Sequence, residues 1–201
     1  MLTDEFDPQK GEMLRIVDEE GEADMGLMPR MSKDLLLKAY RTMLLTRLAD
    51  DKAVKLQRQG RLGAYPPSKG QEASQVGPAM ALKEEDWLVW AFREMGALLW
   101  KGVPLETQYL YWMGNELGNV YPEGTRVTPS VVPVGSQVPQ AVGIAYAGLI
   151  RKEKSVVLAY FGDGATSEGD FHEGLNFAGV FRTPNVFVCQ NNQFAISTRR
   201  S

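Results

Sequence analysis

Apolar residues recur at helical spacing in the first regular stretch of the chain, which follows an N-terminal segment of mixed charge. Residues 1–31 combine charges with Gly and Pro and show no sustained periodicity, which predicts an extended arm. From Ser32 to Gly60, apolar residues return every three or four positions. We therefore predict a helix with Ser32 as its N-cap and Gly60 as its C-terminal stop, which begins a domain over residues 32–201.

The rest of the pattern alternates helix-like and strand-like segments. Helices are predicted over 71–82, 94–100, 105–113, 136–151 and 168–181, and strands over 87–92, 156–161 and 185–190. The Gly- and Pro-rich segment 114–133 is the one long loop expected. Residues 156–190 form a βαβ unit, whose strands are parallel and bring their carboxyl ends to one edge of the sheet. The pattern predicts an α/β fold with a mainly parallel sheet flanked by helices.

Composition and charge exclude several classes of partner. The chain has 201 residues, of which 44% are hydrophobic and 23% charged, and its formal net charge is −3. This composition is ordinary for a globular protein and lacks the basic excess of nucleic-acid binding, so we expect no nucleic-acid partner. The longest weakly polar stretch, 141–150, is too short to cross a bilayer, and the acidic N-terminus does not resemble a signal peptide. We therefore expect a cytoplasmic protein with no membrane partner.

A single cysteine and a single histidine limit the chemistry. These are Cys189 and His172, so an internal disulfide and a zinc site built from several Cys or His ligands are excluded. Cys189 lies in the apolar run 186–189, which predicts a buried thiol. His172 falls in the predicted helix 168–181, where we expect a packing or helix-surface role. We assign no catalytic residue within this chain.

Two short motifs stand at the predicted ligand edge of the sheet. Gly162-Asp163-Gly164 follows the first strand of the βαβ unit, and Asn191-Asn192 follows the second. Glycines let the backbone approach a bound group, and Asp163 and Asn192 offer the hard oxygens that Mg²⁺ or Ca²⁺ prefers. One carboxylate with one neutral amide leaves such a cation underneutralised, which favours a metal-bridged diphosphate. Either motif alone is also an ordinary turn sequence.

Together, the two motifs and the helix and strand between them resemble the thiamin-diphosphate motif of E1 α subunits of 2-oxoacid dehydrogenase complexes. The resemblance runs through 162–170 and 191–198, includes the signatures at 60–63, 70–73 and 137–143, and covers the chain from about Ile16 onward. It implies a thiamin-diphosphate-binding fold over 32–201. The family continues beyond the position of Ser201, through a loop with an active-site histidine, so we expect a C-terminally truncated domain that self-associates or is unstable in isolation.

The resemblance implies a metal site and a diphosphate site. Asp163, the Asn192 side chain and the Phe194 backbone carbonyl would bind Mg²⁺. The backbone amides of Gly164 and Ala165 would face the diphosphate of the cofactor.

Five further residues match cofactor-contacting positions of the family. Arg93 would reach the diphosphate with its planar, multi-donor guanidinium, although a surface salt bridge is the alternative. Phe92 stands where relatives have Tyr, so the hydrogen bond of that hydroxyl is absent. Backbone groups of Val132 and Val134 would hold the aminopyrimidine, and Tyr65 would form an aromatic wall; core packing explains these three residues equally. In some relatives a monovalent-cation loop matches Val131, Pro133, Ser136 and Gln137.

The implied reaction is oxidative decarboxylation of a 2-oxoacid, with transfer of the acyl group to lipoyl-E2. The family's E1 β subunit supplies the glutamate that activates the cofactor, so we expect this chain alone to be inactive. Residues 185–197 and 121–124 look closest to the bacterial pyruvate type. A branched-chain 2-oxoacid or acetoin dehydrogenase α subunit and a non-catalytic cofactor-binding fragment stay open. A metal-dependent phosphohydrolase would need more clustered carboxylates than Asp163, Glu168 and Asp170 offer.

Overall fold

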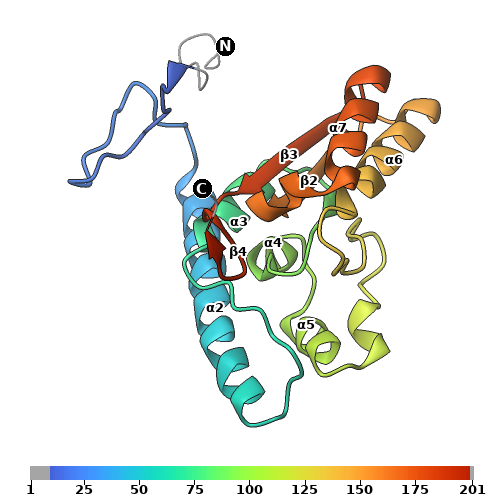
Figure 1. Ribbon diagram of the computed structural model, residues 1–201. Coiled ribbons are helices and arrows are strands. Elements are labelled where there is room, and N and C mark those ends of the chain that lie inside the picture. Colours follow the sequence, from blue (N-terminus) through green and yellow to red (C-terminus); the bar gives the residue numbers. More distant parts are fainter. Residues whose placement is uncertain (1–9, 200–201) are drawn as a thin grey trace. The chain divides into compact units, whose positions relative to one another are not determined.

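The structure is a computed structural model that describes residues 10–199 (Figure 1). The chain divides into two compact units, and the boundary falls between Leu36 and Leu37.

The smaller unit contains a tight reversal of the chain. Val17 and Ala23 form an isolated antiparallel bridge. Within the turn, Asp18 Oδ1 accepts hydrogen bonds from the backbone N–H groups of Glu20 and Glu22, at 3.1 and 2.7 Å. The aspartate thus supplies acceptors that a short turn cannot supply from its own backbone.

The first long helix, α2, covers Lys33–Arg58 and has both predicted end signals. Ser32 Oγ accepts a hydrogen bond from the Leu35 N–H at 3.2 Å, which satisfies one of the N–H groups left open at a helix start. Gly60 adopts φ +71°, a left-handed conformation that glycine takes without steric cost. The prediction of this helix is confirmed at both ends.

The remaining predicted helices are also present, with small differences at their ends. They are α3 (Glu72–Ala79), α4 (Met95–Trp100), α5 (Leu105–Trp112), α6 (Gln137–Ile150) and α7 (Gly169–Phe181). Only α3 is markedly shorter than predicted. The N–H groups of Ala81 and Leu82 bond to carbonyls three residues back, those of Pro78 and Ala79, so the chain leaves the α-helical pattern at this point.

Three parallel strands form the main sheet in the order β1 (Trp87–Val89), β2 (Val157–Gly162), β3 (Asn185–Gln190). Trp87 pairs with Val157, and Val157 pairs with Asn185. The parallel pairing of β2 and β3 through α7 confirms the predicted βαβ unit and the α/β fold class. The prediction of a strand to residue 92 is wrong beyond Val89. The chain turns there because the Glu94 carboxylate accepts hydrogen bonds from backbone N–H groups that a longer strand would direct into the ladder.

The central strand β2 is buried on both faces. Leu158 and Tyr160 point to one face, where they join a core with Leu98 of α4. Val157 and Ala159 point to the other face, against α6. The helices α6 and α7 pack together along that face (Figure 1). Burial on both faces explains why 157–161 reads as a continuous apolar run rather than an alternating one.

The segment 114–133 is more ordered than a long loop. It contains a short 3₁₀-helix, η2 (Glu116–Asn119), and Val127 forms an isolated parallel bridge to Leu88 of β1. Trp90 Nε1 donates a hydrogen bond to the Thr128 carbonyl at 2.8 Å. The predicted long loop is thus tied to the open edge of β1, which offers backbone partners that no local pattern reveals.

Cys189 is exposed, so the predicted burial of its thiol is wrong. It lies on β3, which pairs with β2 and is the last strand of the sheet among residues 10–199. Val186, on the same strand, is also 49% exposed. A short apolar run does not distinguish a central strand from an edge strand, which accounts for the error. No helix in the described part of the chain is long and apolar enough to span a bilayer.

Candidate functional site

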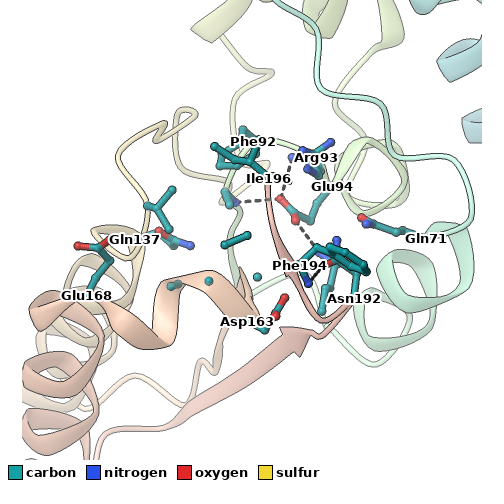
Figure 2. Close-up of a pocket in the computed structure, with 17 residues that line it drawn as sticks. Gln71, Phe92, Arg93, Glu94, Gln137, Asp163, Glu168, Asn192, Phe194 and Ile196 are labelled. Atoms are coloured by element: carbon teal, nitrogen blue, oxygen red, sulfur yellow. Dashed lines mark hydrogen bonds between the residues drawn. The ribbon is translucent and has the colours of Figure 1, made fainter. Parts of the chain in front are cut away.

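A cavity of about 330 Å³ opens at the carboxyl ends of β2 and β3, where the sequence predicts a ligand (Figure 2). It reaches the lower end of the size range of small-molecule sites, about 300–1,000 Å³. Eight of the ten predicted site residues line it: Phe92, Arg93, Val134, Asp163, Gly164, Ala165, Asn192 and Phe194. The structure therefore brings together residues from four separate parts of the chain, whereas Tyr65 and Val132 do not line this cavity.

Asp163 lies at the floor of the cavity and is only 3% exposed. It follows β2 directly and begins the 3₁₀-helix η3 (Asp163–Ser167), whose turn is closed by a hydrogen bond from Thr166 Oγ1 to the Asp163 carbonyl at 2.7 Å. Within residues 10–199, no hydrogen bond or ion pair reaches the Asp163 carboxylate. A carboxylate that lines a cavity without a partner among the described residues is available to bind a cation there.

The first turn of η3 offers backbone donors beside that carboxylate. Gly164 and Ala165 follow Asp163 in this turn, and the first N–H groups of a helical turn have no partner within the turn. A side chain at position 164 would come within 3.3 Å of Ala195 Cβ, so glycine keeps the backbone accessible from the cavity. These donors suit an anion that shares the cation of Asp163.

The loop after β3 places Asn192 and Phe194 at the cavity wall. Asn191 Oδ1 accepts a hydrogen bond from the Gln193 N–H at 3.0 Å, and Asn192 Oδ1 accepts one from the Phe194 N–H at 2.8 Å. Asn191 and Asn192 thus form two successive Asx turns, which shape the loop before the hairpin of β4 (Phe194–Ala195) and β5 (Thr198–Arg199). The Asn192 amide oxygen retains a second lone pair, which is available to a cation.

Arg93 approaches the cavity from the side of β1. Its Nη1 donates a hydrogen bond to the Pro67 carbonyl at 2.6 Å, and its guanidinium lies 5.5 Å from the centre of the Phe92 ring. The Arg93 carbonyl accepts a hydrogen bond from Gln75 Nε2 at 3.0 Å. No carboxylate in the described part of the chain pairs with Arg93, so the surface salt bridge considered as an alternative is not formed there.

Glu94 is a buried carboxylate that the sequence did not mark as a site residue. It is 2% exposed and lines the cavity, and burial raises its pKa above the ordinary value for a glutamate. Its Oε2 accepts hydrogen bonds from the backbone N–H groups of Ala91 and Arg93, and its Oε1 accepts one from Gln190 Nε2 at 2.6 Å. The sequence signal that could have identified Glu94 is its position as an acidic residue soon after the apolar run 87–92.

Two further glutamines on the cavity wall have an amide oxygen without a hydrogen-bond partner among the described residues. They are Gln71, at the start of α3, and Gln137, at the start of α6. Gln137 is 1% exposed, and its Nε2 donates to the Tyr160 carbonyl at 3.1 Å. These buried acceptors line the same cavity as Asp163, so its wall is rich in oxygen atoms that no group among residues 10–199 satisfies.

The charges around the cavity favour a cation together with an anion. Asp163, Glu94 and Glu168 contribute carboxylates, and Arg93 contributes one guanidinium. Residues 10–199 contain no cluster of three or more His, Cys, Asp or Glu side chains arranged to hold a metal alone. A metal here would need ligands from a bound molecule, and the clustered carboxylates of a phosphohydrolase are not found in this part of the chain. His172 is exposed on α7, where its Nε2 lies 2.9 Å from the Thr166 carbonyl oxygen.

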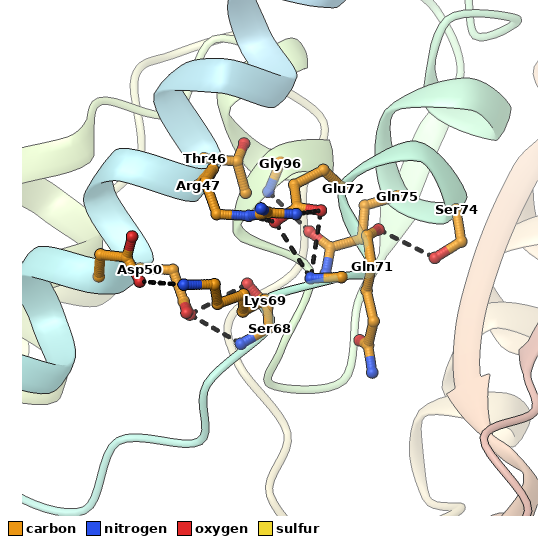
Figure 3. Close-up of polar contacts among 12 residues, drawn as sticks. Thr46, Arg47, Asp50, Ser68, Lys69, Gln71, Glu72, Ser74, Gln75 and Gly96 are labelled. Atoms are coloured by element: carbon orange, nitrogen blue, oxygen red, sulfur yellow. Dashed lines mark hydrogen bonds and ion pairs between the residues drawn. The ribbon is translucent and has the colours of Figure 1, made fainter.

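Tyr65 belongs to a separate group of polar residues beside α2, which we call the anchor cluster: Arg47, Asp50, Tyr65, Ser68 and Glu72. Figure 3 shows Arg47, Asp50, Ser68 and Glu72 of this cluster. Asp50, 1% exposed, accepts three hydrogen bonds at Oδ1, from the Tyr65 hydroxyl (2.8 Å) and from the N–H and hydroxyl of Ser68 (2.7 and 3.2 Å). Burial and the adjacent Asp50 carboxylate raise the pKa of Tyr65.

The second half of the anchor cluster is a bidentate ion pair. Arg47 Nε and Nη2 donate to the two carboxylate oxygens of Glu72 at 2.5 and 2.8 Å. The Gly70 N–H also donates to this carboxylate, at 3.2 Å. The hydrogen bonds from Arg47 lower the pKa of Glu72 to about 2. Asp50 and Glu72 therefore fix the segment 65–72, whose Pro67 carbonyl holds the Arg93 guanidinium.

Comparison with known proteins identifies related sequences over most of the chain. Residues 40–201 match the family model described as "Dehydrogenase E1 component". The "Pyruvate dehydrogenase E1 component subunit alpha" of Acholeplasma laidlawii is 49% identical over 170 residues, which are 85% of this chain and 49% of that protein. The proteins of the same name from Bacillus cereus and Staphylococcus aureus (strain Mu50) are 43% and 41% identical over 93% and 96% of this chain. The chain spans about half the length of these curated relatives.

Proposed function

The chain belongs to the dehydrogenase E1 component family, and from this premise we propose that its cavity holds Mg²⁺ and the diphosphate of thiamin diphosphate. The enzyme it serves would oxidatively decarboxylate a 2-oxoacid. The observation that carries the proposal is the buried Asp163 carboxylate, which has no partner among residues 10–199 and shares a cavity with Arg93 and Asn192.

Three oxygen ligands would hold the metal: the Asp163 carboxylate, the Asn192 side-chain amide oxygen and the Phe194 backbone carbonyl. All three residues line the cavity, and their donor atoms are of the hard type that Mg²⁺ prefers. Because one carboxylate does not neutralise a divalent cation, the phosphate oxygens of the ligand would complete both its coordination and its charge. The residues present therefore fit a metal that arrives with its anion.

The diphosphate would lie between two sets of donors. On one side are the backbone N–H groups of Gly164 and Ala165, and on the other is the guanidinium of Arg93. The hydrogen bond from Arg93 to the Pro67 carbonyl uses one of five N–H donors, so the remaining donors can bind phosphate oxygens in the bidentate manner typical of arginine. By resemblance, Val132, Val134 and Tyr65 would lie toward the aminopyrimidine part of the cofactor, with Phe92 beside Arg93.

When bound, thiamin diphosphate supplies a stabilised carbanion for attack on the 2-oxoacid carbonyl. The residues of this chain bind and orient the cofactor, and none of them is assigned a proton transfer. We propose that an E1 β subunit supplies the activating glutamate, so that this chain alone is inactive, and that lipoyl-E2 receives the acyl group. We propose pyruvate as the substrate because the relatives compared above are named as pyruvate dehydrogenase subunits.

Calorimetric titration of thiamin diphosphate, with and without Mg²⁺, tests the site. The wild-type chain should bind the cofactor only with Mg²⁺, and Asp163→Asn should lose this metal-dependent binding. Asp170→Asn is the matched control, since Asp170 is an exposed carboxylate in the first turn of α7 and does not line the cavity. Unchanged affinity in Asp163→Asn, at equal folded content, would show that the cation is held elsewhere.

A further inference from the structure

Glu94 and Gln190 form a partly buried hydrogen bond that links the segment after β1 to β3, although these two strands are not neighbours in the sheet. Glu94 follows the turn after β1, and Gln190 is the last residue of β3. The strand β2 lies between β1 and β3, yet Gln190 Nε2 donates to Glu94 Oε1 at 2.6 Å. The side chains therefore meet near the carboxyl end of β2, where η3 begins at Asp163; Figure 2 shows Glu94 and Asp163 on the wall of the same cavity.

Each end of this bridge is attached to a different wall of the cavity. On the β1 side, Glu94 Oε2 accepts hydrogen bonds from the Ala91 and Arg93 N–H groups at 2.9 and 3.2 Å. On the β3 side, Gln190 immediately precedes Asn191-Asn192, and its Oε1 accepts a hydrogen bond from Ser74 Oγ at 2.9 Å. One carboxylate thus links the turn that carries Arg93 to the loop that carries Asn192.

We propose that Glu94 and Gln190 are positioning residues. They hold Arg93, on one side of the cavity, and Asn192, on the other side, at the separation that a metal-bound diphosphate requires. The inference rests on the proposed function, because it presumes that Arg93 and Asn192 act on one ligand. Neither residue touches the reacting atoms in this role. Their contribution is to fix both walls before the ligand arrives, which lowers the ordering cost of binding.

The strength of the bridge follows from its surroundings. Glu94 is 2% exposed, so water does not compete for its oxygens, and a hydrogen bond in such surroundings is electrostatically stronger than one in water. Without Gln190, the Glu94 carboxylate would keep its two backbone donors and lose its only bond to the β3 side. The segment that carries Arg93 and the loop that carries Asn192 would then lose the direct side-chain link between them.

Gln190→Met removes the bridge to Glu94 and the hydrogen bond from Ser74, while it preserves side-chain length and the two hydrogen bonds from the Ala91 and Arg93 N–H groups to Glu94. By calorimetry with saturating Mg²⁺, we expect this variant to bind thiamin diphosphate about tenfold more weakly than the wild type. Gln57→Met, at an exposed position of α2, is the matched control and should bind as the wild type does. The thermal midpoints of the wild type and the variants, measured without cofactor, report the stability of each protein independently of binding.

Exchanging the side chains of Glu94 and Gln190 tests whether their hydrogen bond positions the cavity walls or whether any change at Gln190 weakens binding by disturbing the packing. Gln190→Glu alone places two carboxylates together in a buried position and should weaken binding at least as much as Gln190→Met. In Glu94→Gln/Gln190→Glu the donor and acceptor are reversed: Gln at 94 accepts from the backbone N–H groups and donates to the new carboxylate. We expect this pair to bind within about threefold of the wild type.

The outcomes distinguish the inference from the function on which it rests. Equal affinity of Gln190→Met and the wild type would overturn the inference while the wild-type titration still supports the cofactor site. Failure of the exchanged pair to bind better than Gln190→Glu alone would also overturn it. If the wild-type chain binds no thiamin diphosphate with Mg²⁺, both the proposed function and the inference fail.

Discussion

The anchor cluster and the cavity both bury charged side chains, but they differ in what satisfies them. In the anchor cluster, Asp50 accepts three hydrogen bonds and Glu72 pairs with a guanidinium, all from this chain. In the cavity, the Asp163 carboxylate and the amide oxygens of Gln71 and Gln137 have no partner in the described part of the chain. Satisfied buried groups stabilise the fold, whereas unsatisfied ones reduce stability and are retained for binding.

The largest expected effect is the loss of Asp50. Asp50→Ala leaves the Tyr65 hydroxyl and the N–H and hydroxyl of Ser68 without their acceptor in a largely buried place. At about 1–3 kcal/mol for a buried unsatisfied group, we expect the free energy of unfolding to fall by roughly 3 kcal/mol. Urea unfolding of the cofactor-free chain measures this, and a loss below about 1 kcal/mol would contradict the assignment of the cluster as an anchor.

The ion pair between Arg47 and Glu72 in the same cluster should make the free energy of unfolding depend on pH. The pKa of Glu72 is about 2 in the folded chain, against an ordinary value of 4.5 in the unfolded chain. Its stabilising contribution is therefore complete above about pH 4.5 and is lost as the pH falls toward 2. Unfolding free energies of the wild type and Glu72→Gln, measured from pH 6 downward, should differ most at the upper end and converge in acid. A constant difference across this range would argue against the ion pair.

For a cavity residue we expect a smaller change in the free energy of unfolding than for Asp50→Ala, and one of opposite sign. Asp163→Asn removes a carboxylate that has no partner among the described residues, so we expect the cofactor-free chain to become more stable by about 1 kcal/mol. The same variant should lose metal-dependent cofactor binding. Thermal midpoints with and without Mg²⁺ and thiamin diphosphate measure both effects. A destabilised Asp163→Asn chain would place Asp163 among the structural residues, like Asp50.

The smallest effect belongs to the neighbour of Asp50. Asp51 pairs with Lys69 at 2.9 Å, but the two side chains are 42% and 56% exposed. Hydrogen bonding to Lys69 lowers the pKa of Asp51, yet solvent and salt screen an exposed pair of this kind. Asp51→Asn should leave the unfolding midpoint nearly unchanged, and high salt should remove any difference. A clear loss of stability would extend the anchor cluster to the surface.

The fold and part of the cavity could be predicted because their signals are local. Apolar periodicity placed the helices and strands, and parallel βαβ topology brings Asp163 and Asn192 to the same edge. Glu94 and Gln190 were missed because their role arises from a contact across the sheet, between residues 96 positions apart. The exposure of Cys189 was missed because a strand's place in the sheet is a tertiary property that its own residues do not specify.

The order of the strands has a consequence for how the cavity is assembled during folding. Strands β2 and β3 are connected by the short 3₁₀-helix η3 and one α-helix, α7, whereas β1 and β2 are separated by three α-helices and the segment 114–133. The entropy lost on closing a loop grows with its length, by about 0.6 kcal/mol for each doubling. We therefore expect that bringing Asp163 and Asn192 together costs less entropy than bringing Arg93 to either of them. Arg93 would join them when β1 docks against β2.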